Sequence, residues 1–329
     1  MDLLNPPAKP GFFVQGRFLH DASGHKVTLR GVNKMNFWMD RTGASFPEIA
    51  QTGANCVRLV WKAREDNGQP TPAAELDHLI TQCVAQRMIP MVEVHDATGD
   101  WSKLGEMVAF WLRADILAVI QKHEQYLLVN IANECGDDQV TDAQFTEGYE
   151  NAVQQLRQAG IRTTLVIDAA DWGKNLEQLV RVGPGLIQAD PEHNLLFSVH
   201  TYWPILFGAT PEFIRDQFDA AVAAGLPFIV GEWAAFGAFA GGESICGPSG
   251  RIEYQAILSE TNRLDIGWLV WEWGPGNEGG GDPLCTIMDM TTDSRFVNLK
   301  PWGREVALEH PLGIQQTAVR SPFLLNLID

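Results

Sequence analysis

The chain has 329 residues, of which 45% are apolar, and a formal net charge of −17, a composition typical of a globular protein with a sizeable core. The acidic residues are spread along the chain, so nothing would neutralise the phosphates of a nucleic acid or an anionic membrane, and we expect neither as a partner. No apolar run is long enough to span a bilayer. Eleven tryptophans suggest flat apolar platforms for a neutral ligand, although we expect about half of them in the core.

The N-terminal region divides into an arm and the start of a domain. Residues 1–10 contain several prolines, and we expect them to form an arm ahead of a single domain over residues 11–329. Residues 12–28 alternate as a β-hairpin does, with a turn signal at Ser23–Gly24. The first residues have no basic stretch followed by an apolar one. We expect a secreted or periplasmic protein whose signal peptide is not part of this sequence, with a cytoplasmic location still open.

Apolar runs and amphipathic stretches then alternate along the chain. The runs predict eight strands, at residues 28–32, 56–60, 89–94, 127–132, 164–168, 195–199, 228–231 and 267–271. Helical stretches lie between most of them, for example at residues 73–86, 104–122, 142–159 and 211–224. Eight repeats without a linker predict an α/β fold with one closed (β/α)8 barrel. The alternative, a doubly wound open sheet, would normally carry a Gly-rich phosphate loop that residues 29–33 lack, and we expect no cofactor.

Polar and aromatic side chains gather where these strands end. In a barrel of this kind the active site forms at the carboxyl ends of the strands. Those ends carry Asn33, Arg58, Trp61, His95, Asp96, Asn133, Glu134, Asp168, His200, Tyr202, Glu232, Trp233, Trp271 and Trp273. No stability argument explains this concentration, so we expect a functional site at that rim.

Glu134 and Glu232 each close a short apolar run on a separate strand. A buried carboxylate is costly unless it is partnered or faces a cleft, although either residue alone would more often be a solvated residue that opens a loop. Together they form the pair that cleaves a glycosidic bond, in which one group protonates the leaving oxygen and the other attacks the sugar. Their convergence predicts the ~5–5.5 Å carboxyl separation of a retaining enzyme rather than the ~6.5–9.5 Å of an inverting one.

The strand-end residues and four longer segments resemble glycoside hydrolase family 5, which belongs to the clan A retaining β-glycanases. The segments are LRGVN at 29–33, TGANCVR at 52–58, EVHDATG at 93–99 and NIANE at 130–134. They are similar to bacterial endo-β-1,4-mannanases and to branches that cleave β-1,4 and mixed-linkage glucans. The resemblance runs from Gly11 to Asp293 and implies a catalytic (β/α)8 barrel.

The resemblance implies roles for five residues around the glycosidic bond. Glu134 would be the general acid and then the general base, and Asn133 would bind the sugar 2-hydroxyl. Glu232 would be the nucleophile. Arg58 would hold Glu232 ionised, and Tyr202 would donate a hydrogen bond to the same carboxylate.

The remaining expected substrate contacts lie around this pair. His200 would lie near the acid, His95 would bind a sugar hydroxyl and Trp271 would form a stacking floor. The expected substrate-binding set is Arg58, His95, Asn133, His200, Tyr202, Trp271 and Trp273.

Three alternatives stay open for these residues. His95 could be a satisfied core histidine, and Arg58 could pair with Asp96 instead of Glu232. His95, His200 and Asp168 could converge on a metal, but metal-dependent hydrolase barrels usually begin with an HxH pair on the first strand, which this chain lacks. We therefore expect no metal. A barrel that binds carbohydrate without cleaving it is disfavoured, because both carboxylates are present.

The substrate prediction depends on the residues directly after each glutamate. Cys135-Gly-Asp-Asp after Glu134 and Trp-Ala-Ala-Phe-Gly after Glu232 depart from the mannanase pattern. Indoles crowd the strand ends at Trp61, Trp203, Trp233, Trp271 and Trp273. We therefore expect double-displacement cleavage of a β-1,4-linked or mixed β-1,3/1,4-linked glucan, with endo-β-1,4-mannanase as the alternative. The expected partners are plant-type β-glucan or mannan and their oligosaccharides.

The five cysteines show no metal-type spacing. Cys56 and Cys83 fall in apolar segments and are expected to be inert core thiols. Cys246 and Cys285 fall in two Gly-rich regions that could be neighbours. We expect the Gly-rich loops at residues 237–250 and 274–283 to shape the ends of the cleft. A disulfide between these two cysteines stays open, and the odd count leaves at least one thiol free.

Overall fold

A computed structural model of the chain describes residues 11–237, 246–277 and 283–327, so the arm expected at residues 1–10 lies outside the described residues. Eight parallel strands close into one barrel in chain order, with the last strand paired to the first. They are β4 (Arg30–Lys34), β5 (Cys56–Trp61), β6 (Ile89–Val94), β7 (Leu128–Asn130), β8 (Leu165–Asp168), β9 (Leu195–His200), β10 (Phe228–Glu232) and β11 (Gly267–Val270). The predicted (β/α)8 barrel is confirmed.

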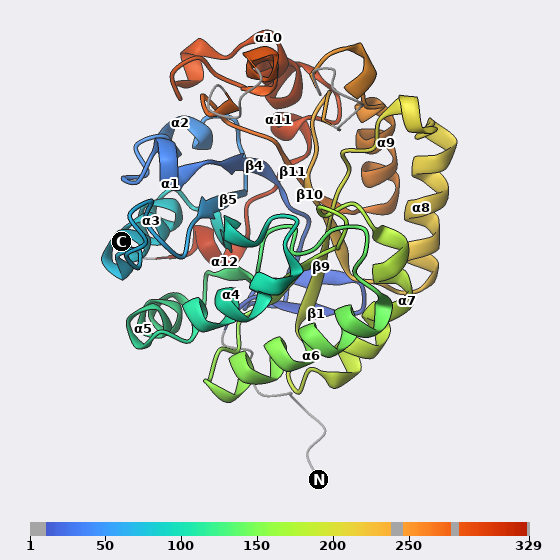
Figure 1. Ribbon diagram of the computed structural model, residues 1–329. Coiled ribbons are helices and arrows are strands. Elements are labelled where there is room, and N and C mark those ends of the chain that lie inside the picture. The colour runs from blue at the N-terminus through green and yellow to red at the C-terminus, as the bar shows by residue number, and fades with distance from the viewer. Residues whose placement is uncertain (1–10, 238–245, 278–282, 328–329) are drawn as a thin grey trace.

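Helices form a ring around the strands (Figure 1). The longer ones are α3 (Ala73–Ala85), α4 (Leu104–Trp111), α5 (Ala114–His123), α6 (Asp142–Gln158), α7 (Leu176–Ala189), α8 (Pro211–Ala223) and α9 (Tyr254–Leu264). Short helices are α1 (Asn36–Met39), α2 (Phe46–Ala50), α10 (Pro301–Arg304), α11 (Ile314–Thr317) and α12 (Pro322–Leu325). The helix expected over residues 104–122 is two helices, because the backbone is extended at Arg113, whose guanidinium donates to Asp115 and to the Thr71 carbonyl.

Alternation along each strand divides its buried residues between two cores. Side chains that face the helices, such as Val57 and Val92, belong to the large core between strands and helices. Side chains that face the barrel axis near its amino end form a smaller apolar cluster. Its barrel members are Leu29, Cys56, Ile89, Met91, Leu128, Val166, Leu196, Ile229 and Leu269.

A small antiparallel sheet closes the amino end of the barrel. Its strands are β1 (Phe13–Gln15), β2 (Phe18–His20) and β3 (Lys26–Val27), and their apolar residues join the axial cluster together with Leu324 of α12. The Ser321 hydroxyl donates to Asp21 and ties α12 to this sheet. The predicted turn at Ser23–Gly24 is present, but a second turn at Gly16, where φ is +61°, makes three strands of the expected hairpin.

Cys246 and Cys285 form the disulfide that the sequence left open, and Cys56, Cys83 and Cys135 are buried free thiols. The disulfide joins the segments that come after β10 and β11. Much of the loops expected to shape the cleft, at residues 238–245 and 278–282, lies outside the described residues. Within the described ranges, no helix has the length and apolar character needed to cross a membrane.

Candidate active site

Arg58 lies inside the carboxyl end of the barrel, two residues beyond Cys56 on β5, and its side chain is fully buried. It donates hydrogen bonds to the side-chain oxygens of Glu232 (2.7 Å), Asn133 (2.7 Å), Asn130 (2.8 Å), Asp168 (3.2 Å) and Asn33 (3.2 Å). Burial lowers the pKa of Arg58, but the surrounding carboxylates, Glu93 first among them, raise it above its ordinary value. Arg58 is therefore a permanent cation that orients the acids of this rim.

Glu232 is the last residue of β10, and the pairing of β10 with β9 shifts register between Val230 and Glu232. Such a shift re-aims the side chain that comes after it. One carboxylate oxygen accepts from Arg58, and the other accepts from the Tyr202 hydroxyl at 2.8 Å. Burial and the charge of Glu232 raise the pKa of Tyr202, which keeps the phenol a donor. Both oxygens of Glu232 are thus held in place.

Glu134 lies just beyond β7 and has a φ of +45°, in the left-handed region that non-glycine residues rarely occupy. Two hydrogen bonds hold this conformation: the Glu134 amide donates to Asp168 at 3.1 Å, and its carbonyl accepts from the Gly99 amide at 2.9 Å. Strained backbone at a catalytic position persists only where its surroundings enforce it. Here they direct the Glu134 side chain towards the same rim as Glu232.

His200 lies between the two acids, with its Nδ1 at 3.7 Å from Glu232 Oε1. Its Nδ1 lies 2.7 Å from Glu134 Oε1, and its Nε2 lies 3.6 Å from Asp168 Oδ2. A glycine at position 231 leaves room for the ring, because a Cβ there would stand 2.1 Å from Ser198 Oγ and 3.1 Å from His200 Nε2. Burial lowers the pKa of His200, but the charges of Glu232, Asp168 and Glu134 raise it to about 9. His200 is therefore protonated near neutral pH, and its Nδ1–H donates a hydrogen bond to Glu134.

The two carboxylates are close. One oxygen of Glu134, one oxygen of Glu232 and a ring nitrogen of His200 all lie within 4.8 Å of one another. This spacing agrees with the short separation of retaining glycosidases, ~5–5.5 Å, and not with the ~6.5–9.5 Å of inverting ones. Glu134 Oε2 accepts no hydrogen bond from the described residues and is the oxygen available to a substrate.

His95 lies beside this pair and is partly exposed, so it is not a core histidine. Its Nδ1 is 2.8 Å from the buried carboxylate of Glu93. Burial by itself lowers the pKa of His95, but the nearby charge of Glu93 outweighs this effect, so the pKa lies above its ordinary value. The ring stacks on Trp271 at 6.3 Å between centroids and meets Trp38 edge-on at 5.7 Å. Glu93 thus holds the His95 ring between two indoles.

A family model described as cellulase (glycosyl hydrolase family 5) matches residues 20–277, which include every residue of this site. The chain belongs to glycoside hydrolase family 5. It is 31% identical over 313 residues to a mannan endo-1,4-β-mannosidase of Salipaludibacillus agaradhaerens, covering 94% of each chain. A mannan endo-1,4-β-mannosidase of Cellvibrio japonicus is 30% identical over 94% of this chain and 69% of its own.

Solved structures agree with the sequence relatives. A mannohexaose complex of the Thermomonospora fusca β-mannanase superposes with a TM-score of 0.81 at 30% identity, over 95% of this chain and 99% of that one. The enzyme is therefore a retaining glycoside hydrolase of family 5 built on a (β/α)8 barrel.

The expected sugar-binding residues of the family 5 site differ in their exposure. Arg58, Asn133 and His200 are fully buried. Arg58 and His200 contact the two acids directly, whereas Asn133 accepts from Arg58 and donates to Thr98, and its expected sugar contact stays a prediction. Arg58 does not pair with Asp96, which instead accepts the Ala63 amide at 2.7 Å. Tyr202, His95 and Trp271 are partly exposed and remain candidates for sugar contacts.

Trp273 does not face the cleft, which corrects its expected role. Its side chain is fully buried, and its indole N–H donates to the Ser294 carbonyl. Strand β11 ends at Val270, so the alternation that would have placed Trp273 on the same side as Trp271 no longer applies. Trp61, Trp203 and Trp233 are also core residues, with exposed fractions of 0%, 8% and 0%.

Several residues of this site were not expected. Glu93 and Asn130 are the polar residues inside otherwise apolar strands, and Thr98 accepts a hydrogen bond from Asn133 at 2.8 Å. The sequence did carry a signal for Glu93 and Asn130, because each lies two positions beyond an apolar residue that faces the barrel axis. Trp38 and Trp172, each 42% exposed, lie outside the strands and carried no such signal.

Among the described residues, one group of three has the spacing of metal ligands: Glu134, His200 and Glu232. Each has another use here, because His200 is protonated and bound to Glu134, and Arg58 and Tyr202 hold Glu232. A protonated imidazole has no lone pair to give a metal. The group therefore fits an acid pair better than a cation site, and His95 is not part of it.

Proposed function

We propose that the enzyme is an endo-β-1,4-mannanase in which Glu232 is the nucleophile and Glu134 the acid/base. The observation that carries the assignment of roles is the unequal treatment of the two carboxylates. Glu232 has both oxygens bound by fixed donors, one of them the Arg58 cation, whereas Glu134 has one oxygen left for a substrate. A nucleophile must be an oriented anion, and an acid must reach the leaving oxygen.

The first chemical step is glycosylation. A Glu232 oxygen forms a bond to the anomeric carbon as the bond from that carbon to the leaving oxygen breaks, and the proton of Glu134 passes to the leaving oxygen. Arg58 and Tyr202 prevent Glu232 from rotating, so its attack costs little reorganisation. In the second step water gives a proton to Glu134 and attacks the anomeric carbon, and the bond to Glu232 breaks.

His200 would manage the proton between these steps. Its ring is 2.7 Å from Glu134, so the pair can hold one proton at either position. When Glu134 carries the proton, His200 is its neutral partner. When Glu134 has passed this proton to the leaving oxygen, the ring stays neutral and its Nδ1–H donates a hydrogen bond to the new carboxylate until water restores the acid.

The choice of mannan has two supports. Relatives at 30–31% identity are named mannan endo-1,4-β-mannosidases, and a mannohexaose complex of a β-mannanase shares the fold closely. The indoles that favoured a glucan provide less support than expected, because Trp61, Trp203, Trp233 and Trp273 are in the core. The glucan preference predicted from the sequence therefore gives way to its alternative.

Two exposed indoles are placed to bind sugar rings on opposite sides of the acids. Trp38 lies next to His95, which in turn stacks on Trp271. Trp172 packs against Gly99, whose amide binds the Glu134 carbonyl, and a Cβ at position 99 would stand 2.3 Å from the Trp172 indole nitrogen. Platforms on both sides of the cleaved bond suit internal cleavage of a chain.

The test is a comparison of kcat/KM on soluble galactomannan, glucomannan, barley mixed-linkage glucan and carboxymethylcellulose. We expect at least about a tenfold preference for the mannose-containing polymers, equivalent to roughly 1.4 kcal/mol of transition-state binding. Mannohexaose should be cleaved at internal bonds, so that its products are oligosaccharides and not mannose alone. Barley glucan cleaved as well as galactomannan would overturn the substrate assignment.

We also infer an oxidising compartment, which agrees with a secreted or periplasmic protein. The Cys246–Cys285 disulfide supports this, because such bonds form and persist outside the reducing cytosol. Alkylation of the denatured enzyme from its native host should label these two cysteines only after reduction. Labelling without reduction would contradict the inference.

A further inference from the structure

A cavity of about 410 Å³ lies against the chain that follows Glu232. The chain from Glu232 to Gly237 separates this cavity from the active site. Glu232 belongs to the catalytic pair, and Gly237 packs on the Tyr202 ring, where a Cβ would stand 2.5 Å away. Between them, Ala235 and Phe236 line the cavity. The cavity is thus a separate pocket that shares one wall with the catalytic site.

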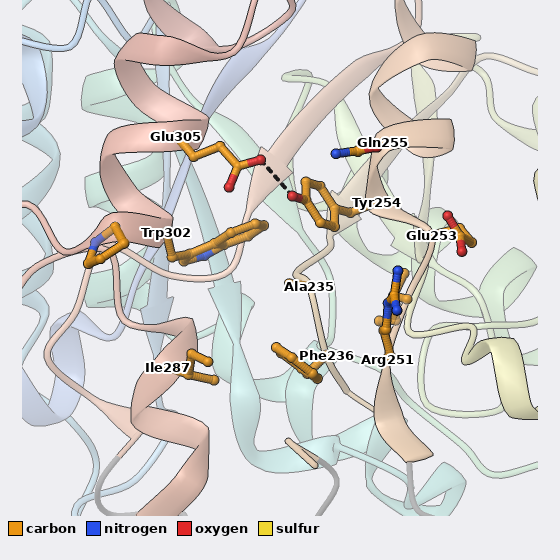
Figure 2. Close-up of a pocket in the computed structure, with 11 residues that line it drawn as sticks. Ala235, Phe236, Arg251, Glu253, Tyr254, Gln255, Ile287, Trp302 and Glu305 are labelled. Atoms are coloured by element: carbon orange, nitrogen blue, oxygen red, sulfur yellow. Dashed lines mark hydrogen bonds between the residues drawn. The ribbon is translucent and has the colours of Figure 1, made fainter. Parts of the chain in front are cut away.

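The pocket has an apolar surface that can accept the face of a ring. Figure 2 shows Trp302 and Ile287 on one wall, with Phe236 on the other. Trp302 is fixed by edge-on contacts with Tyr254 at 5.2 Å and Trp233 at 5.8 Å. The Trp302 side chain is more than nine-tenths buried, and its indole N–H has no hydrogen-bond partner among the described residues. The Trp302 indole is therefore a fixed aromatic wall of the pocket.

Polar groups surround this apolar surface. Arg251 and Glu253 lie close together at the start of α9, but neither makes a side-chain hydrogen bond or ion pair with the described residues. Glu305 accepts the Tyr254 hydroxyl at 2.5 Å with one oxygen, as Figure 2 shows, and its second oxygen has no bond to the described residues. A donor fork and two carboxylates therefore line the same pocket as the apolar platform.

These features define the chemistry of the ligand. Two carboxylates against one arginine, in a protein of net charge −17, disfavour an anionic ligand. A flat apolar face surrounded by donors and acceptors is what a neutral pyranose requires, with its C–H face on the aromatics and its hydroxyls on the charged groups. The Cys246–Cys285 disulfide ties the chain just before Arg251 to the chain just before Ile287, so the two walls are linked covalently.

We propose that this pocket is a second carbohydrate site, which holds a neutral hexopyranosyl unit of the polysaccharide outside the catalytic cleft. In naming mannan as its polymer, the proposal rests on the function proposed above. A site on the other side of the Glu232–Gly237 wall gives the enzyme a second grip on a long substrate, and two linked sites raise the effective concentration of chain at the acids.

The experiment uses full-length Glu232→Ala protein, so that the sugar is not cleaved, with its isoleucine methyl groups and tryptophan indole N–H groups labelled for NMR. Titration with mannohexaose should shift the Ile287 methyl resonance to saturation. When Arg251→Ala is introduced into the same protein, the apparent Kd obtained from the Ile287 methyl shift should rise roughly tenfold, because a charged hydrogen bond to the sugar is lost. Phe236→Ala should do the same through the loss of the platform.

Arg17→Ala is the matched control, because it removes the same charge at the opposite end of the barrel, where Arg17 lies over the Phe18 ring. It should leave the Ile287 titration unchanged. The Trp271 indole resonance reports the catalytic cleft independently in the same titration. Saturation at Trp271 with no change at Ile287 would overturn the second site and leave the mannanase assignment intact. No response at either position, with no hydrolysis by the wild type, would overturn both.

Discussion

The barrel interior has a lower half, at the amino ends of the strands, and an upper half, at their carboxyl ends. The same strands build both halves, with residues that lie two positions apart along each strand. On β5, β6, β7 and β8 the axial residues Cys56, Met91, Leu128 and Val166 belong to the apolar cluster. Two positions further along, the same strands carry Arg58, Glu93, Asn130 and Asp168, all fully buried. The step is about 6.6 Å along a strand.

This comparison separates stability from chemistry within one core. The lower half contributes apolar burial and is sealed by the β1–β3 sheet and α12. The upper half buries charges, which is costly unless every group has partners. Arg58 provides most of those partners, so the upper half is a network that orients acids and not a source of net stability.

The largest effect should result from a change in the upper half. Glu232→Ala should lower kcat on every substrate by at least about 10⁴-fold, because no glycosyl–enzyme bond can form. Circular dichroism should show a folded barrel, since Arg58 keeps Asp168, Asn130 and Asn133 as partners. Steady-state kinetics that retain a tenth of the wild-type rate would place the nucleophile elsewhere.

Glu134→Ala should be less severe and should depend on the substrate. On mannan we expect a loss of about 10²–10⁴-fold, whereas an aryl glycoside with an activated leaving group needs no proton and should still form the intermediate. Azide should then restore turnover and give a β-configured glycosyl azide. If azide instead rescued Glu232→Ala with retained configuration, the two roles would be reversed.

The lower half should respond in stability alone. Leu128→Ala removes a fully buried side chain from the axial cluster and should lower the free energy of unfolding by about 2–5 kcal/mol. The kcat measured below the melting transition should stay at the wild-type value. Leu128→Ile is the volume-matched control, with an expected cost under about 1.5 kcal/mol. A fall in kcat at about 25 °C without unfolding would show that the lower half also affects catalysis, contrary to this prediction.

Glu272 sharpens the comparison, because it is an upper-rim carboxylate outside the catalytic network. It is fully buried, its Oε1 has no partner among the described residues, and burial raises its pKa from 4.5 to about 7. The folded state therefore holds this proton more tightly than the unfolded state, and stability falls as pH rises from about 4.5 to 7. Above that window the loss is complete.

Glu272→Gln should remove this pH dependence. Urea unfolding should be measured at about pH 5 and about pH 8. Between these two values, the free energy of unfolding of the variant should rise relative to that of the wild type by up to roughly 3 kcal/mol. Replacement of Glu253 by Gln is the control, because this carboxylate just before α9 makes no side-chain bond to the described residues, and it should show no such gain. Equal pH dependence in the Glu272 variant and the wild type would contradict a raised pKa at this site.

The sequence by itself determined the barrel and the rim at which the two proposed acids lie. Eight apolar runs spaced by amphipathic stretches can bury their residues on both faces only as a parallel sheet covered by helices, and the carboxyl ends of its strands must meet at one rim. Glu134, Glu232, Arg58, His200 and Tyr202 were predicted at that rim because they directly end, or interrupt, those runs.

Tertiary structure decided which side chains face the cleft. Trp271 and Trp273 look alike in sequence, but β11 ends at Val270, so strand alternation does not carry over and Trp273 turns into the core. Trp38, in the short helix α1, and Trp172 reach solvent from segments outside the barrel strands, whose course depends on contacts distant in sequence. The partners of Arg58 come from strands separated by 25 to 174 residues, and only closure of the barrel brings them within hydrogen-bonding distance.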